Sequence, residues 1–432
     1  MKLLSVSLVN HDSNVTYFDG SDIHHLKLER LHCIKRYNSC HFYHIEDQIK
    51  RYLNVEYKDI DEIVFDWDSV VADNYGLRNK NINEKYYNFF DEYYDNNDLY
   101  FEINEELKHI LGINHKKAYH LTHHYAHSLS GWMLMEERPD ISFVIDGYGD
   151  NRSWSIFRKE QFIDKGLIPD GSIGNKMEDV GEYLNIKSKY KMDHAGKVMG
   201  IQSYGNLDTG FLEVLRNYDI RNINEIFSTE LWTEYKGDYL VNVLSPLDWI
   251  KTVHFRMEEL LVEFFKQYAE PEENIFYSGG VAQNVIWNTE LKKHFPNLVI
   301  PPHSGDEGMS FGGIEWLRIK NNLPKFKLPN FPYVQIDEAP KSEPSEKTIQ
   351  IAAELLAEGK AIAWYQGHGE VGPRALGNRS ILFDPRVKNG KDIVNGVKRR
   401  EWYRPFAGFI LEEYFQEYFE THGLDKSEFM TI

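Results

Sequence analysis

Two sets of three short apolar segments constrain the fold of this chain more than any other feature of its sequence. The first set covers residues 2–9, 14–18 and 23–30, and the second covers residues 141–150, 151–158 and a segment near 162–168. In both sets a polar turn with an acidic residue follows an apolar segment directly. Strands joined in this way and followed later by helices are typical of α/β domains, and their recurrence predicts a duplicated pair.

Later segments of the chain fit the same α/β class. Residues 274–295 have the pattern of a strand, a glycine turn and a helix, and residues 298–321 that of a strand, a loop and a helix. Gly279 and Gly280 in the first of these loops allow close approach to a ligand, although a plain tight turn is the alternative. In actin-like and RNase-H-like folds, two equivalent acidic turns face each other across a nucleotide cleft, and we expect that arrangement here.

Charge and composition exclude several classes of protein. The 432 residues are enough for two or three domains, and the formal net charge of −18 makes nucleic acid an unlikely main partner. No apolar run approaches the roughly 18 residues that a membrane span needs. Cys33 and Cys40 are the only cysteines, and they form neither a disulfide framework nor a zinc-binding pattern. We therefore expect a cytoplasmic protein.

Four residues form a candidate metal site. His123 and His127 are four residues apart, so both imidazoles lie on one face of a helix. Asp146 ends an apolar strand, and Asp306 precedes a predicted helix. A mixed nitrogen and oxygen set suits iron(II), manganese or zinc, and magnesium is a further alternative. The other interpretations are a pair of core histidines and, for Asp306, a helix N-cap, which is compatible with metal binding.

The turn after the first strand holds a candidate catalytic pair, His11 and Asp12. Histidine titrates near neutral pH, so His11 can take a proton from an attacking hydroxyl. The alternative is a turn residue bonded to its own backbone, and for Asp12 that alternative is slightly preferred.

A proline-rich stretch divides the chain. Five of its 15 prolines fall between residues 324 and 344, which disfavours regular structure. We expect a first domain over residues 1–323, a linker over residues 324–346 and a second domain over residues 347–432. Within the first domain, residues 72–106 carry three aromatic pairs for which packing in a core or against a partner is the better interpretation. These pairs are Tyr86–Tyr87, Phe89–Phe90 and Tyr93–Tyr94.

The expected second domain concentrates positive charge in an otherwise acidic chain. Its cations lie among glycine, proline and asparagine residues, and they are Arg374, Arg379, Lys398, Arg400 and Arg404. Guanidinium groups bind phosphate bidentately. A solvated basic helix face fits poorly, because the arginines are not at helical spacing. The cluster therefore predicts a site for a small phosphorylated ligand.

Taken together, the motifs resemble one family. In chain order they are NHDSNVTYFDG, HHYAHSLSG, VIDGYGD, HAGKVMGIQSYG, YSGGVAQN, GDEGMSFGG, GPRALGNRSILFDPR and VKRREWYRPFA. They resemble the NodU/CmcH O-carbamoyltransferases, and the HxxxH pair and GGVAQN are shared with the tRNA-threonylcarbamoyl transferases. The resemblance implies an actin-like domain with metal and nucleotide, followed by a YrdC-like domain. It implies that carbamoyl phosphate and ATP give carbamoyl adenylate, whose carbamoyl group passes to a hydroxyl of a small-molecule acceptor.

The resemblance also implies roles for single residues. His123, His127, Asp146 and Asp306 resemble the metal ligands, and His11 resembles a residue near the acceptor hydroxyl. The residues that resemble nucleotide or phosphate contacts are Lys197, Gly279, Gly280, Asn284, Arg374, Arg379, Lys398 and Arg404.

Family members continue well past the RPFA segment, whereas this sequence stops at Ile432. We therefore expect only a partial YrdC-like domain, either because the natural chain is short or because a second polypeptide supplies the rest. Two other functions stay open. One is the transferase half of a split enzyme that modifies a nucleotide or sugar, and the other is an inactive binding subunit.

Overall fold

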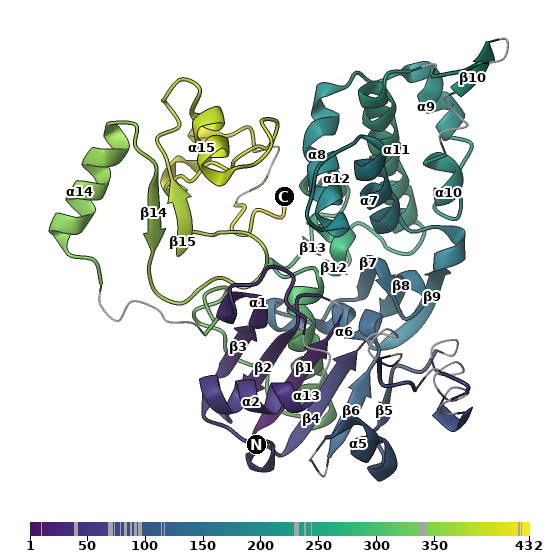
Figure 1. Cartoon of the computed structure of the whole chain (residues 1–432), viewed down its shortest axis with the longest axis vertical. Helices are drawn as coiled ribbons and strands as arrows, with labels where there is room; N and C mark the ends of the chain where they lie inside the picture. Colours follow the sequence, from purple (N-terminus) through teal and green to yellow (C-terminus); the bar gives the residue numbers. More distant parts are fainter. Residues whose placement is uncertain are drawn as a thin grey trace.

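The computed structural model describes most of the chain. The residues outside the description are 10, 39–41, 68–71, 73, 78, 82–83, 87–88, 90–92, 94–96, 114, 116, 229–232, 237–238, 243, 337–342, 422–423 and 425. The structure contains two large sheets. The first lies at the bottom of the view in Figure 1, and the second lies to the right of centre, below a group of helices. Among the described helices, none has the length and apolar character that crossing a bilayer would need.

The first sheet is mixed and has six strands in the order β3-β2-β1-β4-β6-β5. They are β1 (Leu3–Leu8), β2 (Asn14–Phe18), β3 (Ile23–Lys27), β4 (Glu62–Trp67), β5 (Tyr100–Glu102) and β6 (Ala118–Leu121). β1, β2 and β3 form an antiparallel meander, whereas β4 runs parallel to β1 and β6 parallel to β4. Every residue of β1 is buried, as expected for a central strand covered on both faces.

The second sheet repeats this plan, with the order β13-β12-β7-β8-β9. Its strands are β7 (Ile141–Gly149), β8 (Arg152–Arg158), β9 (Gln161–Leu167), β12 (Ile275–Ser278) and β13 (Leu298–Val299). β7, β8 and β9 again form an antiparallel meander, and β12 and β13 run parallel to β7. If β5 is left out and the strands of each sheet are numbered in chain order, both sheets have the order 3-2-1-4-5. β5 is an extra edge strand of the first sheet. The predicted duplicated α/β domain is therefore confirmed, as are the strand positions in both sets apart from the end of β3.

Helices fill the layer between the two sheets and cover their outer faces (Figure 1). α6 (His123–Leu129) and α13 (Met309–Lys320) share one apolar cluster with both sheets, as Ala126 and Phe311 show. α2 (Phe42–Leu53) covers the outer face of the first sheet. α11 (Pro246–Lys266) covers the second, where Phe265 stacks on Phe143 at 3.8 Å between ring centroids. This burial of apolar side chains is the main stabilising contribution of the fold.

The other helices and strands complete the description. They are α1 (Leu28–Leu31), α5 (Glu105–Leu111), α7 (Ile173–Tyr183), α8 (His194–Ile201), α9 (Thr209–Leu215), α10 (Ile223–Ile226), α12 (Val285–His294), α14 (Glu346–Ala357), α15 (Gly390–Lys398), α16 (Phe415–Tyr418), β10 (Thr233–Lys236), β11 (Tyr239–Asn242), β14 (Ile362–Tyr365) and β15 (Arg379–Leu382). The expected first-set strand over 23–30 ends at Lys27, where the chain turns into α1.

The aromatic segment over residues 72–106 is only partly described. Tyr86 and Tyr93 are 3% and 4% exposed and belong to the core of the first sheet, which agrees with the packing interpretation. Tyr87, Phe90 and Tyr94 lie outside the described residues.

The C-terminal segment, residues 346–432, is anchored to the first sheet by one short region. Gln335 bridges His25 of β3 on one side and Gly369 on the other. Glu370 and Val371 directly after it are fully buried. By contrast, α14 buries none of its residues, and β14 and β15 form a two-stranded sheet. Part of the expected linker, residues 337–342 with Pro340, lies outside the described residues, and the expected domain boundaries stay predictions.

Candidate metal centre and ligand cavity

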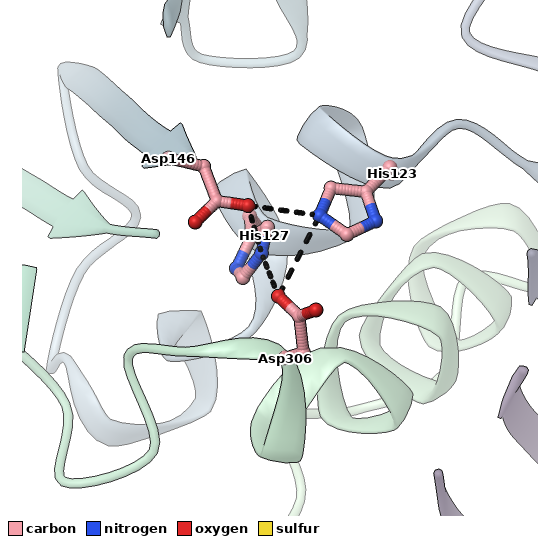
Figure 2. A group of neighbouring side chains, drawn as sticks. All are labelled: His123, His127, Asp146 and Asp306. Carbon is pink, nitrogen blue, oxygen red and sulfur yellow. Dashed lines mark hydrogen bonds and ion pairs between the residues drawn. The ribbon is translucent and has the colours of Figure 1, made fainter. Parts of the chain in front are cut away.

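The four candidate metal ligands come from three places in the chain, and their side chains point toward one another (Figure 2). His123 begins α6, His127 lies one turn later, Asp146 lies near the end of β7, and Asp306 begins the turn before α13. Nε2 of His123 lies 3.2 Å from Oδ2 of Asp146, and Nε2 of His127 lies 3.2 Å from Oδ1 of Asp306. The other two cross pairs, His123–Asp306 and His127–Asp146, are 3.6 and 3.8 Å apart.

This geometry fits a small divalent cation. One ligand atom from each residue lies within 4.8 Å of all the others. Ligands about 2.1 Å from a tetrahedrally bound ion lie about 3.4 Å from one another, which is close to the measured separations. All four residues are at most 9% exposed, so water competes little for the ligand atoms. The set of two imidazole nitrogens and two carboxylate oxygens suits iron(II), manganese or zinc.

Close contact between buried imidazoles and carboxylates shifts the pKa values of the site. Burial lowers the pKa of His123, but the carboxylates of Asp306, Asp146 and Asp66 raise it well above its ordinary value. Burial raises the pKa of Asp146, yet its hydrogen bond to His123 and the nearby imidazoles hold it below its ordinary value. The buried carboxylates therefore favour the protonated form of His123, whose Nε2 atom faces Asp146 and Asp306.

His11 and Asp12 lie at the edge of this group. Nδ1 of His11 is 2.8 Å from Oδ2 of Asp12, and Nε2 of His11 is 3.5 Å from Oδ2 of Asp306. Asp12 also accepts a hydrogen bond of 2.6 Å from Arg36 and lies 3.6 Å from Nζ of Lys27. Its side chain is thus held by three neighbours. The alternative of a turn residue bonded to its own backbone does not describe its contacts.

The titration of His11 follows from these contacts. Burial lowers its pKa, but Asp306 and Asp12 together raise the value to about 9. Asp12 itself has a pKa held below its ordinary value, because His11, Lys27 and Arg36 outweigh the effect of burial. Asp12 therefore fixes the His11 ring, because its carboxylate accepts a hydrogen bond from Nδ1–H. Nε2 of His11 is then directed toward Asp306.

A cavity of about 650 Å³ opens beside the metal group and brings together most of the predicted site residues. Those that line it are His11, Asp12, His123, Asp146, Lys197, Gly280, Asn284, Asp306, Arg374 and Arg404. Gly279 does not line the cavity, but it has φ +96° and a Cβ there would lie 2.2 Å from the carbonyl oxygen of Ile145. Only glycine fits that close approach to β7.

Asn284 and Lys197 already have protein partners. Oδ1 of Asn284 accepts from the N–H groups of Ile286 and Trp287, so it caps α12. Lys197 on α8 forms a 2.6 Å ion pair with Glu401 of the C-terminal segment. Its role as a nucleotide contact therefore requires a ligand phosphate to replace Glu401, and it stays a prediction.

Arg374 and Arg404 reach the cavity from the C-terminal segment. Arg374 donates a hydrogen bond of 3.2 Å to the carbonyl oxygen of Gln283, the last residue of the 3₁₀ turn that begins at Gly280. Burial lowers the pKa of Arg374, and the nearby charge of Arg404 lowers it further. Two like charges that line one half-buried wall are typical of an anion site.

The other three predicted cations lie elsewhere. Arg379 pairs at 3.1 Å with the buried Glu370. Arg400 donates to Asn395 at 2.5 Å and to the carbonyl oxygen of Pro405 at 2.7 Å. Lys398, like these two, is absent from the described cavity lining. Their assignment as phosphate contacts stays a prediction, and the contacts of Arg379 and Arg400 are those of structural residues.

Three cavity residues carry no motif and escaped the sequence analysis. Lys27 and Arg36 hold Asp12, and Glu178 on α7 is a half-buried carboxyl whose pKa is raised by burial to about 7. One signal for Lys27 existed in principle. It pairs with Asn14 in the β2–β3 register, which places it beside the first turn. Glu178 and Arg36 carry no such signal.

Comparison with known proteins identifies the family of this chain. The carbamoyltransferase N-terminus family model matches residues 2–314, and the carbamoyltransferase C-terminus model matches residues 353–432. The nodulation protein NolNO of Sinorhizobium fredii is 30% identical over 69% of this chain and 48% of its own length. The 3'-hydroxymethylcephem-O-carbamoyltransferase of Streptomyces clavuligerus is 28% identical over 51% of this chain and 44% of its own.

Two further comparisons place the chain among less characterised proteins and solved structures. The uncharacterized protein MJ1058 of Methanocaldococcus jannaschii is 27% identical over 74% of this chain and 59% of its own length. HypF of T. kodakarensis is 13% identical, with a TM-score of 0.45, over 75% of this chain and 48% of that structure. The chain spans about half to two thirds of the length of the curated relatives that it matches most strongly.

The structure thus combines a duplicated α/β domain with a buried His–Asp group and a cavity of about 650 Å³ beside that group. Because the N-terminal family model covers most of it, the chain belongs to the carbamoyltransferase family.

Proposed function

We propose that this chain transfers a carbamoyl group to a hydroxyl of a small-molecule acceptor in the 650 Å³ cavity. The carbamoyl group comes from carbamoyl phosphate, by way of carbamoyl adenylate formed with ATP. One observation carries the proposal: the His–Asp group and the arginines of the C-terminal segment line the same cavity. A cation and an anion site that share a cavity suit a substrate that combines a carbonyl with a phosphate leaving group.

We propose iron(II) as the ion of this site, with manganese, zinc and magnesium as alternatives. His123, His127, Asp146 and Asp306 would hold the ion. Once bound, such an ion supplies Lewis-acid stabilisation of charge that develops in the transferred group.

His11 is the residue placed to handle the acceptor proton. The acceptor oxygen bonds to the carbamoyl carbon, the bond from that carbon to the phosphate oxygen breaks, and the acceptor proton passes to Nε2 of His11. AMP leaves with the electron pair of the broken bond. Asp12 holds the ring through Nδ1. Because Asp306 is a main cause of the raised pKa of His11, neutralising its charge brings that pKa toward the range of a general base.

The cations of the cavity supply the other half of the chemistry. Arg374 and Arg404 are placed to bind the phosphate of the adenylate and to offset the charge of the departing AMP. Lys197 joins them when its pair with Glu401 opens. Removal of one hydrogen bond from a charged donor of this kind lowers the binding free energy by about 1.5–3 kcal/mol.

The acceptor class rests on the relatives. One relative is named for carbamoyl transfer to the hydroxymethyl group of a cephem, and others are nodulation proteins. We propose a small-molecule alcohol of the same kind for this chain. A sugar or nucleotide hydroxyl is the alternative, and an inactive binding subunit is a third; the shared cavity argues against the third because a scaffold needs neither ion site.

We also propose that the C-terminal segment requires additional polypeptide to complete a YrdC-like adenylation domain. Of its described residues, only 369–372, Val394, Asn395 and Tyr403 are buried. Its apolar side chains are widely exposed, and Phe409 reaches 84%. A unit of this size normally builds its own core. Gel filtration with and without a candidate partner tests this, and a lone monomer with full adenylation activity contradicts it.

The activity is tested with the purified chain, alone and together with a candidate polypeptide that completes its C-terminal segment, in the presence of ATP, carbamoyl phosphate, Mg²⁺ and iron(II), without acceptor. Mass spectrometry then detects pyrophosphate and carbamoyl adenylate. We expect Arg404→Met to abolish both products and Arg386→Met to leave them unchanged, because Arg386 is exposed and pairs only with Asp384 among the contacts described. If the wild-type chain forms neither product and binds neither AMP nor a divalent ion, the proposal is wrong.

A further inference from the structure

Arg404 reaches the cavity from a short loop, residues 400–404, that follows α15 and is held together from inside. The buried side chain of Asn395 on α15 donates to the carbonyl oxygens of Trp402 and Arg404 at 3.3 and 3.1 Å. Its Oδ1 accepts from Nε of Arg400 at 2.5 Å. No hydrogen bond or ion pair holds the Arg404 guanidinium among the residues that the structure describes. Its position therefore depends on where this loop lies.

The loop is docked on the helical layer of the second sheet by a contact outside the cavity. The rings of Trp402 and Tyr204 meet edge to face, with 4.7 Å between their centroids. Tyr204 ends the 3₁₀ turn that follows α8. Nζ of Lys391 on α15 donates to the Tyr204 hydroxyl at 3.0 Å and lies 5.8 and 5.9 Å from the Tyr204 and Trp402 ring centroids. None of these three residues lines the described cavity, so they hold the loop without facing a ligand.

The next two residues of the loop lie directly against α8. A Cβ at Gly200 of α8 would lie 3.4 Å from Cδ2 of Tyr403 and 3.9 Å from Cδ of Arg404. Tyr403 is buried by this contact and its neighbours. The Tyr403 ring and the Arg404 stem thus lie on the surface of α8, and the docking of Trp402 on Tyr204 keeps them there.

The same loop also occupies the lysine of the cavity wall. Nζ of Lys197, one turn before Gly200 on α8, forms the 2.6 Å ion pair with Glu401 and donates to the carbonyl oxygen of Lys187 at 2.5 Å. An ammonium group has three donors, so a ligand phosphate can replace Glu401 while the contact with Lys187 stays. A phosphate bound at Arg404 beside an unmoved Glu401 carboxylate would meet a like charge. The pair therefore competes with an anionic ligand.

We propose that residues 400–404 are a docking loop that assembles the anion site through two contacts of opposite effect. Trp402, held by Tyr204, is a positioning residue that places Arg404 at the cavity and so favours anion binding. Glu401 neutralises Lys197 in the ligand-free protein and gives way to the phosphate group of the ligand, so it opposes anion binding. The inference rests on the proposed phosphate-binding role of the cavity.

The test of positioning measures the affinity of the full chain for AMP by isothermal titration calorimetry, with the unfolding temperature recorded in parallel. Tyr204→Ala and Trp402→Ala each remove one ring of the docking contact, and a double variant removes both. Tyr204→Phe keeps the ring as the conservative variant. Tyr183→Ala is the matched control, because Tyr183 is about as exposed as Tyr204 and its ring meets Trp249 edge to face outside the described cavity lining.

We expect Tyr204→Ala and Trp402→Ala to weaken AMP binding about three- to tenfold. The double variant should be no weaker than the weaker single variant, because the two rings form one contact. Tyr204→Phe should restore most of the affinity, and Tyr183→Ala should match the wild type. A lower unfolding temperature with unchanged AMP affinity contradicts the positioning role.

The test of Glu401 uses the same titration. Glu401→Gln should raise the affinity for AMP about two- to fivefold, because it removes a competing carboxylate of a partly exposed ion pair. Glu354→Gln, which removes the same charge from the exposed helix α14 of the same segment, should leave the affinity unchanged. If Glu401→Gln instead weakens AMP binding as Tyr204→Ala does, the ion pair is a structural clamp and the proposed competition is wrong.

The remaining outcomes separate this inference from the proposed function. If the wild type binds AMP, Arg404→Met abolishes that binding and the Tyr204 and Trp402 variants bind as the wild type does, the docking loop is wrong while the anion site stands. If the wild type binds no AMP, the anion site is wrong and the inference is wrong with it. Tyr204→Phe and Glu401→Gln change few atoms, so the comparison stays decisive if an alanine variant does not fold.

Discussion

The backbone N–H of Gly280 donates a hydrogen bond of 2.7 Å to Oδ1 of Asp146, and it leaves Oδ2 of the same carboxylate facing His123 and His127. A Cβ at position 280 would lie 2.8 Å from that Oδ1 atom, which is shorter than a normal contact. The glycine thus orients Asp146, a candidate metal ligand, by a hydrogen bond and by the absence of a side chain. Gly279 and Gly280 therefore do more than form a tight turn, because Gly280 also positions the Asp146 carboxylate.

Gly280→Ala should weaken metal binding by about tenfold, because the new methyl group displaces Asp146. Co²⁺ titration of the metal-free protein measures the effect. Gly396→Ala is the matched control, since a Cβ at that helical position of α15 meets nothing within 4 Å. Equal affinity of the Gly280 variant and the control would show that Asp146 does not need this support.

His11 should make the stability of the metal-free protein depend on pH. Its pKa in the folded state is about 9, above its ordinary value of 6.5, so the folded protein binds this proton more tightly than the unfolded chain. The contribution is fully present below about pH 6.5 and is lost as pH rises through 9. The difference in unfolding free energy between wild type and His11→Gln should shrink over that interval in urea titrations. A constant difference from pH 6 to 9.5 contradicts the expectation.

Arg374→Met should reduce the affinity for AMP ten- to a hundredfold, because it removes a partly buried charged donor from the cavity. Isothermal titration calorimetry of the metal-loaded chain measures the change. Arg386→Met, which removes an exposed arginine outside the cavity, should leave AMP binding unchanged. An unchanged affinity in Arg374→Met would place the phosphate elsewhere.

Glu370→Ala should loosen the C-terminal segment. Oε1 of the fully buried Glu370 accepts from the N–H groups of Leu376, Asn378 and Arg379, and its Oε2 pairs with the Arg379 guanidinium. Removal of the Glu370 carboxylate leaves the Arg379 guanidinium and three N–H donors without this acceptor. The free energy of unfolding should fall by about 3–5 kcal/mol. Limited proteolysis should cut residues 346–432 faster while the two large sheets stay resistant. Glu354→Ala on the exposed helix α14 is the control. Equal cleavage rates in both variants would argue against this anchor.

Local patterns were sufficient for the strands. The two sets of apolar segments predicted β1 and β2 to within a residue, and also β7 and β8, because alternation and polar turns are properties of neighbouring residues. The HxxxH spacing likewise placed both imidazoles on one face of α6. Spacing along the chain says nothing, however, about which face of a sheet a residue such as Asp66 occupies, since that depends on which strands become neighbours.

The sequence by itself determined the class of fold, the family resemblance and the residue types able to bind a cation and a phosphate. Only the tertiary structure decided which of those residues share a cavity. It brought Asp306 beside His127, 179 positions earlier in the chain, and Arg374 beside Gln283, while it paired Arg379 with Glu370 away from the cavity. The physical reason is that burial and long-range strand order, which set these distances, are determined by the packing of the whole chain and by no local pattern.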